Sequence, residues 1–248
     1  MQTAMRLSGV SVLLADMALV AGMIISGVHG LGTEALPLTS PQGLQHLGRS
    51  AEWYTLRETL WLAYPIFVLP QGIALYALLR DRAPTLLWPL VLWCVGLTLG
   101  IGVDVATVGI ARGFGLLYLT AGVETRPLIE SVGQTIAHAT LLAQFVCDTM
   151  SGTLVYPFFA VAAYRARFIS RGLGLTVVIS SILVFVMYRG MNLTLGEGTT
   201  LSTVCGLGVY GLIWWDVSIA AKLLRVRSVD LGDMHMVTEG PTRRASHG

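Results

Sequence analysis

Apolar residues dominate the chain in six long runs, which short turns or mixed polar segments separate. The runs cover about 8–28, 59–79, 86–108, 136–163, 172–192 and 201–224. Because about 20 apolar residues suffice for a helix to cross the hydrocarbon of a bilayer, each run is long enough to span it. The pattern predicts an all-α, polytopic membrane helix bundle with six transmembrane helices, in a single domain over residues 1–224.

The first run, 8–28, has a cleaved signal peptide as its alternative, since Arg6 precedes an apolar stretch. Its length, its interruption by Asp16 and its ending without a clear small-x-small cleavage site favour a membrane span instead. Ala18, Gly22, Ser26 and Gly30 recur at every fourth position of this run. Such a row of small residues lets another helix approach closely.

Lys and Arg residues are distributed unequally between the connections of the six spans. The N-terminus, the second and fourth connections and the C-terminal region hold eleven of them, against five in the three longer loops. The positive-inside rule therefore predicts that both termini face the cytoplasm. The segment 225–248 mixes charged residues with Gly, Pro and Ser and has no apolar period, so we expect a disordered cytoplasmic tail.

The longer connections carry structural signals of their own. Ser40 suits a helix N-cap and Pro41 a first helical position, and the apolar spacing that follows predicts an amphipathic helix leading directly into the second span. Residues 109–135 are interpreted as a loop without a seventh span; its part GFGLLYLTAG is apolar enough to lie in the membrane interface, and the sequence leaves open whether it forms an interfacial helix. Pro65 and Pro70 should kink the second span, because each removes a backbone hydrogen bond.

The composition excludes several classes of protein. Hydrophobic residues make up 54% of the chain and charged residues only 12%, which leaves too little polar surface to cover a soluble core. A net charge of +2 does not indicate a nucleic-acid partner. The three cysteines lie inside apolar runs at unrelated spacings, so we expect neither a disulfide framework nor a metal site. Membrane lipid, a membrane protein or a second copy of the chain are the expected partners.

Polar side chains inside the spans are the candidates for function. An ionised group near the bilayer centre costs at least about 2.5 kcal/mol, so each needs a partner, a proton or water. Counting about 1.5 Å of rise per residue places Asp16 and Asp216 at one depth, while Gln144, Asp148 and Ser151 share one face of the fourth span. These five residues are the predicted ligand- or ion-binding set. Structural hydrogen bonding within the bundle is the alternative.

A second polar group is predicted near the outer ends of the spans. Opposite charges at similar depth favour ion pairs such as Asp104 with Arg189 or Arg112, and these pairs either fix helix register or surround a cavity. The members of this outer polar cluster are Arg57, Glu58, Asp104, Arg112, His138 and Arg189. His29 and His138 lie near the same surface, where axial haem ligation competes with hydrogen bonding at the interface. No cofactor is expected.

Three stretches resemble a family of small bacterial six-helix membrane proteins that is catalogued as a domain of unknown function. They are LRETLWLAYPIFVLPQGIALYALLR, LVYPFFAVAAYRARFISRGLG and the final span ending in IAAKLLRVR. The likeness extends in order and spacing over roughly residues 8–226. It implies six spans and a multi-pass protein of the bacterial cytoplasmic (inner) membrane, and it implies no activity.

The functional hypothesis that follows is a non-enzymatic membrane protein, which binds a small or lipidic ligand in its bundle or assembles with membrane partners. Nucleotide-binding, metalloprotease and hydrolase motifs are absent from the sequence. A small proton- or cation-coupled transporter using Asp16, Asp148 and Asp216 is the alternative, although no inverted repeat is evident. An intramembrane enzyme or a haem protein is the third hypothesis.

Overall fold

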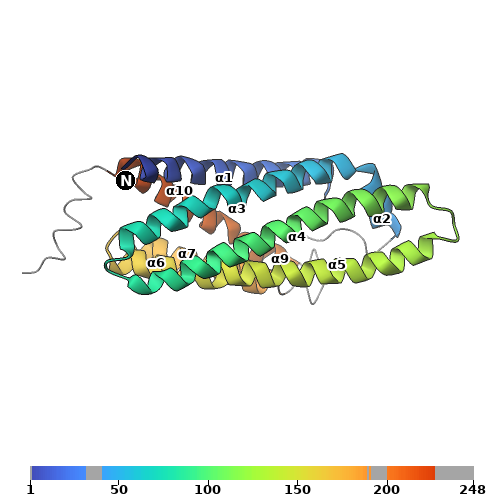
Figure 1. Cartoon of the computed structure of the whole chain (residues 1–248). Coiled ribbons are helices and arrows are strands. Elements are labelled where there is room, and N and C mark those ends of the chain that lie inside the picture. Colours follow the sequence, from blue (N-terminus) through green and yellow to red (C-terminus); the bar gives the residue numbers. More distant parts are fainter. Residues whose placement is uncertain (1, 32–40, 189, 191–199, 227–248) are drawn as a thin grey trace, which may run out of the picture.

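The computed structural model describes residues 2–31, 41–188, 190 and 200–226, and in these ranges the chain is helical apart from its turns. Six of the helices are long and apolar enough to cross a membrane. They lie side by side in an elongated bundle (Figure 1). The described elements, in chain order, are α1 (Gln2–His29), α2 (Pro41–Arg49), α3 (Ala51–Leu79), η1 (Pro84–Leu86), α4 (Leu87–Thr120), α5 (Arg126–Asp148), η2 (Thr149–Leu154), α6 (Val155–Arg165), α7 (Arg171–Ser181), η3 (Ile182–Tyr188), α9 (Thr200–Gly206) and α10 (Val209–Arg225).

The protein is therefore an all-α, multi-pass membrane protein. Four of the six candidate crossings are composite: one joins η1 to α4, one joins α5, η2 and α6, one joins α7 to η3, and the last joins the end of α9 to α10. The segments η2 and η3 are π-helical, while η1 is a short 3-10 turn that leads into α4. Pro65 and Pro70 both lie inside the helical α3. The predicted tail falls almost entirely outside the described residues.

The core of the bundle is aromatic at its centre. Trp93 of α4 packs at 5.9 Å between ring centroids against both Phe159 and Tyr156 of α6. Trp215 of α10 is 1% exposed. Helix α1 packs against α3 and α10, and Gly22 lies directly under the Trp61 ring, where a β-carbon would come within 2.6 Å of ring atoms. The small-residue row of α1 thus serves a close helix contact at Gly22.

The interpretation of 109–135 as a loop is wrong. Helix α4 continues to Thr120, and after a turn α5 begins at Arg126. With 34 residues, α4 is about 51 Å long, whereas the hydrocarbon of a bilayer is about 30 Å thick. The α4–α5 hairpin therefore projects well beyond the end of the bilayer. The apolar residues of this hairpin, whose sequence suggested an interfacial loop, pack around a small second core.

This second core confirms the predicted amphipathic helix, which begins at Pro41 as α2 and is followed at once by α3. Leu44 and Leu47 of α2 are fully buried and pack with Tyr118 of α4 and Ile129 of α5. Helix α2 lies along the far part of α4 (Figure 1). We call this unit the cap; it comprises α2 and the projecting parts of α4 and α5.

The opposite end of the molecule collects the N-terminus, the end of α10 and the turns α3–α4 and α6–α7 (Figure 1). The Gln2 amide donates to the Val226 carbonyl at 3.2 Å, which joins the two ends of the described chain. Most of the arginines that the structure describes lie at this end. We call it the arginine-rich end.

The α6–α7 turn, RARFISR, is closed by a specific hydrogen-bond pattern. Arg167 adopts a left-handed φ of 59°. Its N–H donates to the Tyr164 carbonyl at 2.9 Å, and the N–H of Phe168 donates to the Ala163 carbonyl at 2.8 Å. These are the two hydrogen bonds of a Schellman motif. Ser170 then caps α7 by accepting from the Leu173 N–H. The two caps hold Arg165 and Arg171 in defined places at the arginine-rich end.

Candidate functional site

A cavity of about 550 Å³ lies inside the bundle, between the arginine-rich end and the cap. Residues from α1, α3, α4, the α5–η2–α6 run, η3, α9 and α10 line it. Most of the lining is apolar, including Leu19, Met23 and Leu97. We call it the central cavity.

One side of the central cavity is polar. Asp104 of α4 and Gln144, Asp148 and Ser151 of the α5–η2 run all border it. Gln144 and Asp148 are one helical turn apart, and Ser151 follows at the next, with its hydroxyl donating to the Cys147 carbonyl at 2.8 Å. The side chains of this set are partly buried. Gln144, Asp148 and Ser151 of the predicted binding set thus border the same cavity as Asp104 of the predicted outer polar cluster.

Close backbone packing brings α4 to this polar side. A β-carbon on Gly96 would lie 2.9 Å from the Ser151 β-carbon. Gly100, one turn later, meets nothing within 4 Å and borders the cavity. Asp104 follows on the same face. The glycines thus allow α4 to contact η2 and then leave open space beside Asp104.

Both π-helical segments border the central cavity. Ser151 belongs to η2, and Val184, Phe185 and Tyr188 belong to η3. The two segments touch at Gly152, where a β-carbon would lie 2.2 Å from the Phe185 ring. A π-helical turn widens a helix locally and is frequent at functional sites.

Asp216 of α10 is the centre of a second polar group. The amide of Gln71 donates to its Oδ1 at 2.9 Å, and the hydroxyl of Tyr64 donates to its Oδ2 at 3.1 Å. Asp216 is 1% exposed. Both donors belong to α3, seven residues apart and therefore on one face of that helix. The sequence-based candidates did not include them, although two polar residues on one face of an apolar span were a usable signal.

Asp16 of α1 lies close enough to Asp216 for the two carboxyl groups to interact electrostatically. Asp16 is 6% exposed, and neither of its carboxyl oxygens accepts a hydrogen bond from any residue that the structure describes. Within the same residues, neither carboxyl group forms an ion pair with an Arg, Lys or His side chain. We call these two residues the aspartate pair.

A tyrosine pair connects the aspartate pair with the central cavity. The hydroxyls of Tyr64 and Tyr156 are hydrogen-bonded at 2.9 Å, and Tyr64 also donates to Asp216. Both tyrosines border the cavity. Tyr64 lies on α3, and Tyr156 lies on α6 within the stretch LVYPFF. Their contact therefore depends on how these two helices pack against each other. The five predicted binding residues therefore form two groups, joined by two tyrosines that spacing alone did not identify.

Comparison of the chain with protein-family models, with curated proteins and with solved structures finds no match. Membership in the bacterial six-helix family therefore stays a prediction. The geometry alone has to carry the functional argument.

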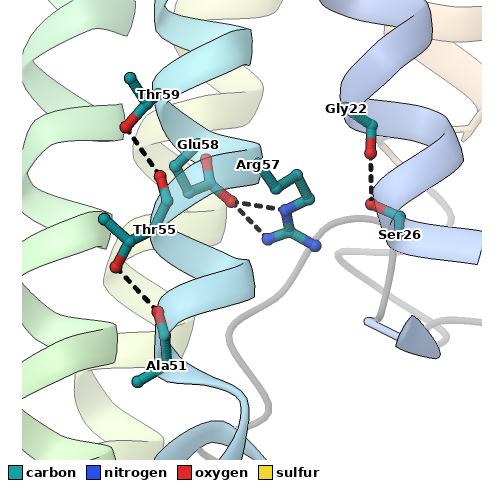
Figure 2. A network of polar contacts seen from close by, with 7 residues as sticks. All are labelled: Gly22, Ser26, Ala51, Thr55, Arg57, Glu58 and Thr59. Atoms are coloured by element: carbon teal, nitrogen blue, oxygen red, sulfur yellow. Dashed lines mark hydrogen bonds and ion pairs between the residues drawn. The ribbon is translucent and has the colours of Figure 1, made fainter. Parts of the chain in front are cut away.

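The described members of the predicted outer polar cluster lie at several places in the bundle, and whether Arg189 joins any of them stays a prediction. Arg57 and Glu58 pair with each other, both almost fully buried, as Figure 2 shows. The Arg57 guanidinium also lies 4.8 Å from the centre of the Tyr54 ring and 4.6 Å from that of Trp61. Two aromatic faces and one carboxylate hold this cation at the cap end of α3. It fixes helix packing there.

The other members of the outer cluster are dispersed. Asp104 borders the central cavity, whereas Arg112 and His138 are exposed. Arg189 lies outside the described residues, so the expected pairing of Asp104 with Arg189 stays a prediction. His138 bonds through Nδ1 to the Gln134 carbonyl of its own helix.

The histidine arrangement does not favour a haem site. The ring of His29 stacks on Trp53 with 3.8 Å between ring centroids, and His138 is exposed on α5. Within the described ranges, no group of three or more His, Cys, Asp or Glu side chains is placed to hold a metal ion.

Proposed function

We propose that this membrane protein binds a small amphiphilic or lipidic ligand in its central cavity, without transforming it. The observation that carries the proposal is the cavity itself: about 550 Å³, apolar over most of its lining, with carboxyl, amide and hydroxyl groups gathered on one side. Ligand pockets typically have about 300–1,000 Å³ and a few polar groups that orient the ligand.

The arrangement of the lining restricts the chemistry of the ligand. Asp104 and Asp148 supply carboxyl oxygens on the polar side, and Gln144 and Ser151 supply an amide and a hydroxyl. These groups suit a ligand head that donates hydrogen bonds or carries positive charge. The apolar remainder, with Trp93 and Phe185, suits a hydrocarbon or ring-containing body.

Two glycines of α4 allow a matched test. Gly100 borders the cavity and Gly102 is exposed, and a β-carbon at either position meets nothing within 4 Å. We expect Gly100→Leu to fill part of the cavity and to reduce the ligand that co-purifies after gentle extraction, as measured by mass spectrometry of organic extracts. Gly102→Leu should leave it unchanged.

Cys147 supplies an independent reporter, since it is one of the residues that line the cavity. In a protein carrying Cys94→Ser and Cys205→Ser, removal of the ligand with excess detergent should speed labelling of Cys147 by a thiol reagent. Absence of any co-purifying molecule, together with labelling that detergent does not change, would contradict the proposal.

Proton- or cation-coupled transport is the second candidate, and the tyrosine pair favours it. Transport coupled to an ion requires a buried ionisable site in communication with the substrate site. The aspartate pair is such a site, and Tyr64 and Tyr156 connect it to the cavity by hydrogen bonds. In this case Asp16 and Asp216 hold the coupling ion, while Asp148 faces the substrate.

The proposed location is the bacterial cytoplasmic membrane, with the arginine-rich end toward the cytoplasm. The distribution of Lys and Arg supports this orientation. Assembly with a membrane protein or a second copy is compatible with the exposed apolar faces of the bundle, and lipid covers those faces otherwise.

A further inference from the structure

A groove of about 520 Å³ lies at the arginine-rich end, separate from the central cavity. Residues 82–86, which include all of η1, form one side. Residues of α6 from Pro157 to Arg165, with Ala166 just after the helix, form the other. The groove is therefore located where two turns leave the membrane region.

Two guanidinium groups border this groove, those of Arg82 and Arg165. Arg82 donates through Nη1 to the Ala166 carbonyl at 3.1 Å, which holds its side chain across the gap between the two turns. A guanidinium has five N–H donors, so this bond leaves others available. Across the described chain, no carboxylate lies within 4.0 Å of either group, whereas neighbouring Arg80 contacts Asp81 at 3.7 Å.

The remainder of the groove is lined by apolar residues, two of which are exposed on the surface of α6. Phe158 is 57% exposed and Val161 is 43% exposed, and both belong to the same side of α6 as Arg165. Phe158 precedes Arg165 by seven residues, which is about 10 Å deeper along the helix. The groove thus has a cationic end at the surface and an apolar lining that extends into the membrane.

We propose that this groove is a binding site for one anionic phospholipid. Arg82 and Arg165 bind the headgroup phosphate, and an acyl chain lies along Val161 and Phe158. Charge complementarity selects the anionic headgroup, because paired guanidinium groups match phosphate oxygens by geometry as well as by charge. Basic pockets between membrane helices bind anionic headgroups in this way.

The test is lipid binding to the full chain, delipidated in detergent and measured by native mass spectrometry. Phosphatidylglycerol and phosphatidylcholine with the same acyl chains are added in separate titrations. We expect one phosphatidylglycerol to bind in preference to phosphatidylcholine. In the double variant Arg82→Gln, Arg165→Gln the affinity for phosphatidylglycerol should fall at least about tenfold, since two charge-assisted contacts are lost.

The matched control is the double variant Arg167→Gln, Arg171→Gln. It removes the same charge from the same end of the molecule, at residues that do not border the groove. We expect it to keep the lipid preference. An equal loss in both double variants, or no preference in the unaltered protein, would overturn the site.

A second variant separates a lipid from a free anion and avoids altering the turns. Phe158→Ser changes an exposed side chain in the apolar lining and keeps both arginines. It should weaken phosphatidylglycerol binding several-fold. If instead it has no effect, and inorganic phosphate displaces the lipid at equal concentration, the groove binds a free anion and the lipid assignment is wrong.

Discussion

Asp16 and Asp216 are chemically alike but differ in their surroundings. Asp216 accepts hydrogen bonds from Gln71 and Tyr64, whereas Asp16 accepts none from the described residues, although both are buried. A buried polar group without a partner costs free energy that a satisfied group does not. The two residues should therefore respond differently to substitution.

We expect Asp216→Ala to lower the free energy of unfolding by about 1–3 kcal/mol, because it removes the acceptor of two buried donors. Asp16→Ala should leave the stability unchanged or raise it. The measurement is the thermal unfolding midpoint of each variant in the same detergent. A loss of stability at Asp16 as large as that at Asp216 would show that Asp16 has a structural partner.

The same aspartates also allow a test of the transport candidate. Its measurement is proton movement, which a purely structural role of these residues would not affect. In proteoliposomes with an entrapped pH-sensitive dye, an imposed Na⁺ gradient should drive proton movement in the unaltered protein. Asp16→Asn should abolish it while the stability stays unchanged. No proton movement in the unaltered protein under Na⁺ or K⁺ gradients would count against exchange of these cations for protons.

Counting helical rise placed Asp16 and Asp216 at a common depth, and in the structure the two are near enough to interact electrostatically. The same counting could not identify Tyr64, because a hydrogen-bond partner from another helix depends on the rotation of that helix. Position along a helix follows from residue number. Rotation about its axis follows only from packing.

Helix α4 illustrates how packing decides the length of an element. The sequence predicts its start well, but its end depends on α2, which covers the apolar residues that follow the membrane span. Without that cover, those residues would lie in an interface or a loop. The contact is closest at two glycines, since a β-carbon on Gly48 would lie 2.5 Å from the Gly115 carbonyl oxygen.

We therefore expect Gly115→Ala to destabilise the cap by about 1–3 kcal/mol, because its β-carbon would lie 2.7 Å from the Gly48 nitrogen. Gly113→Ala, on the same helix, meets nothing within 4 Å and serves as the control. Hydrogen exchange of α2 amides measures the effect locally. Equal exchange in the two variants would show that the α2–α4 contact does not hold the cap.

The orientation of the whole bundle can be tested at two turns on opposite ends. In a protein whose three native cysteines are replaced by Ser, Gly122→Cys lies in the α4–α5 turn and Asp81→Cys in the α3–α4 turn. If the arginine-rich end faces the cytoplasm, a membrane-impermeant thiol reagent labels the first in intact cells and the second only after permeabilisation. The reverse pattern would invert the orientation.

Hydropathy and charge were enough to predict an all-α, six-span membrane protein and the cap helix α2, since burial of apolar length and N-cap chemistry are local properties of the chain. The sequence also singled out Gln144, Asp148 and Ser151 as one face. Only the tertiary structure placed Asp104 at the same polar side of the cavity, supplied Gln71 and Tyr64 as donors to Asp216, and extended α4 into the cap. These features depend on helix rotation and on contacts between segments far apart in the chain, which no periodicity along the sequence encodes.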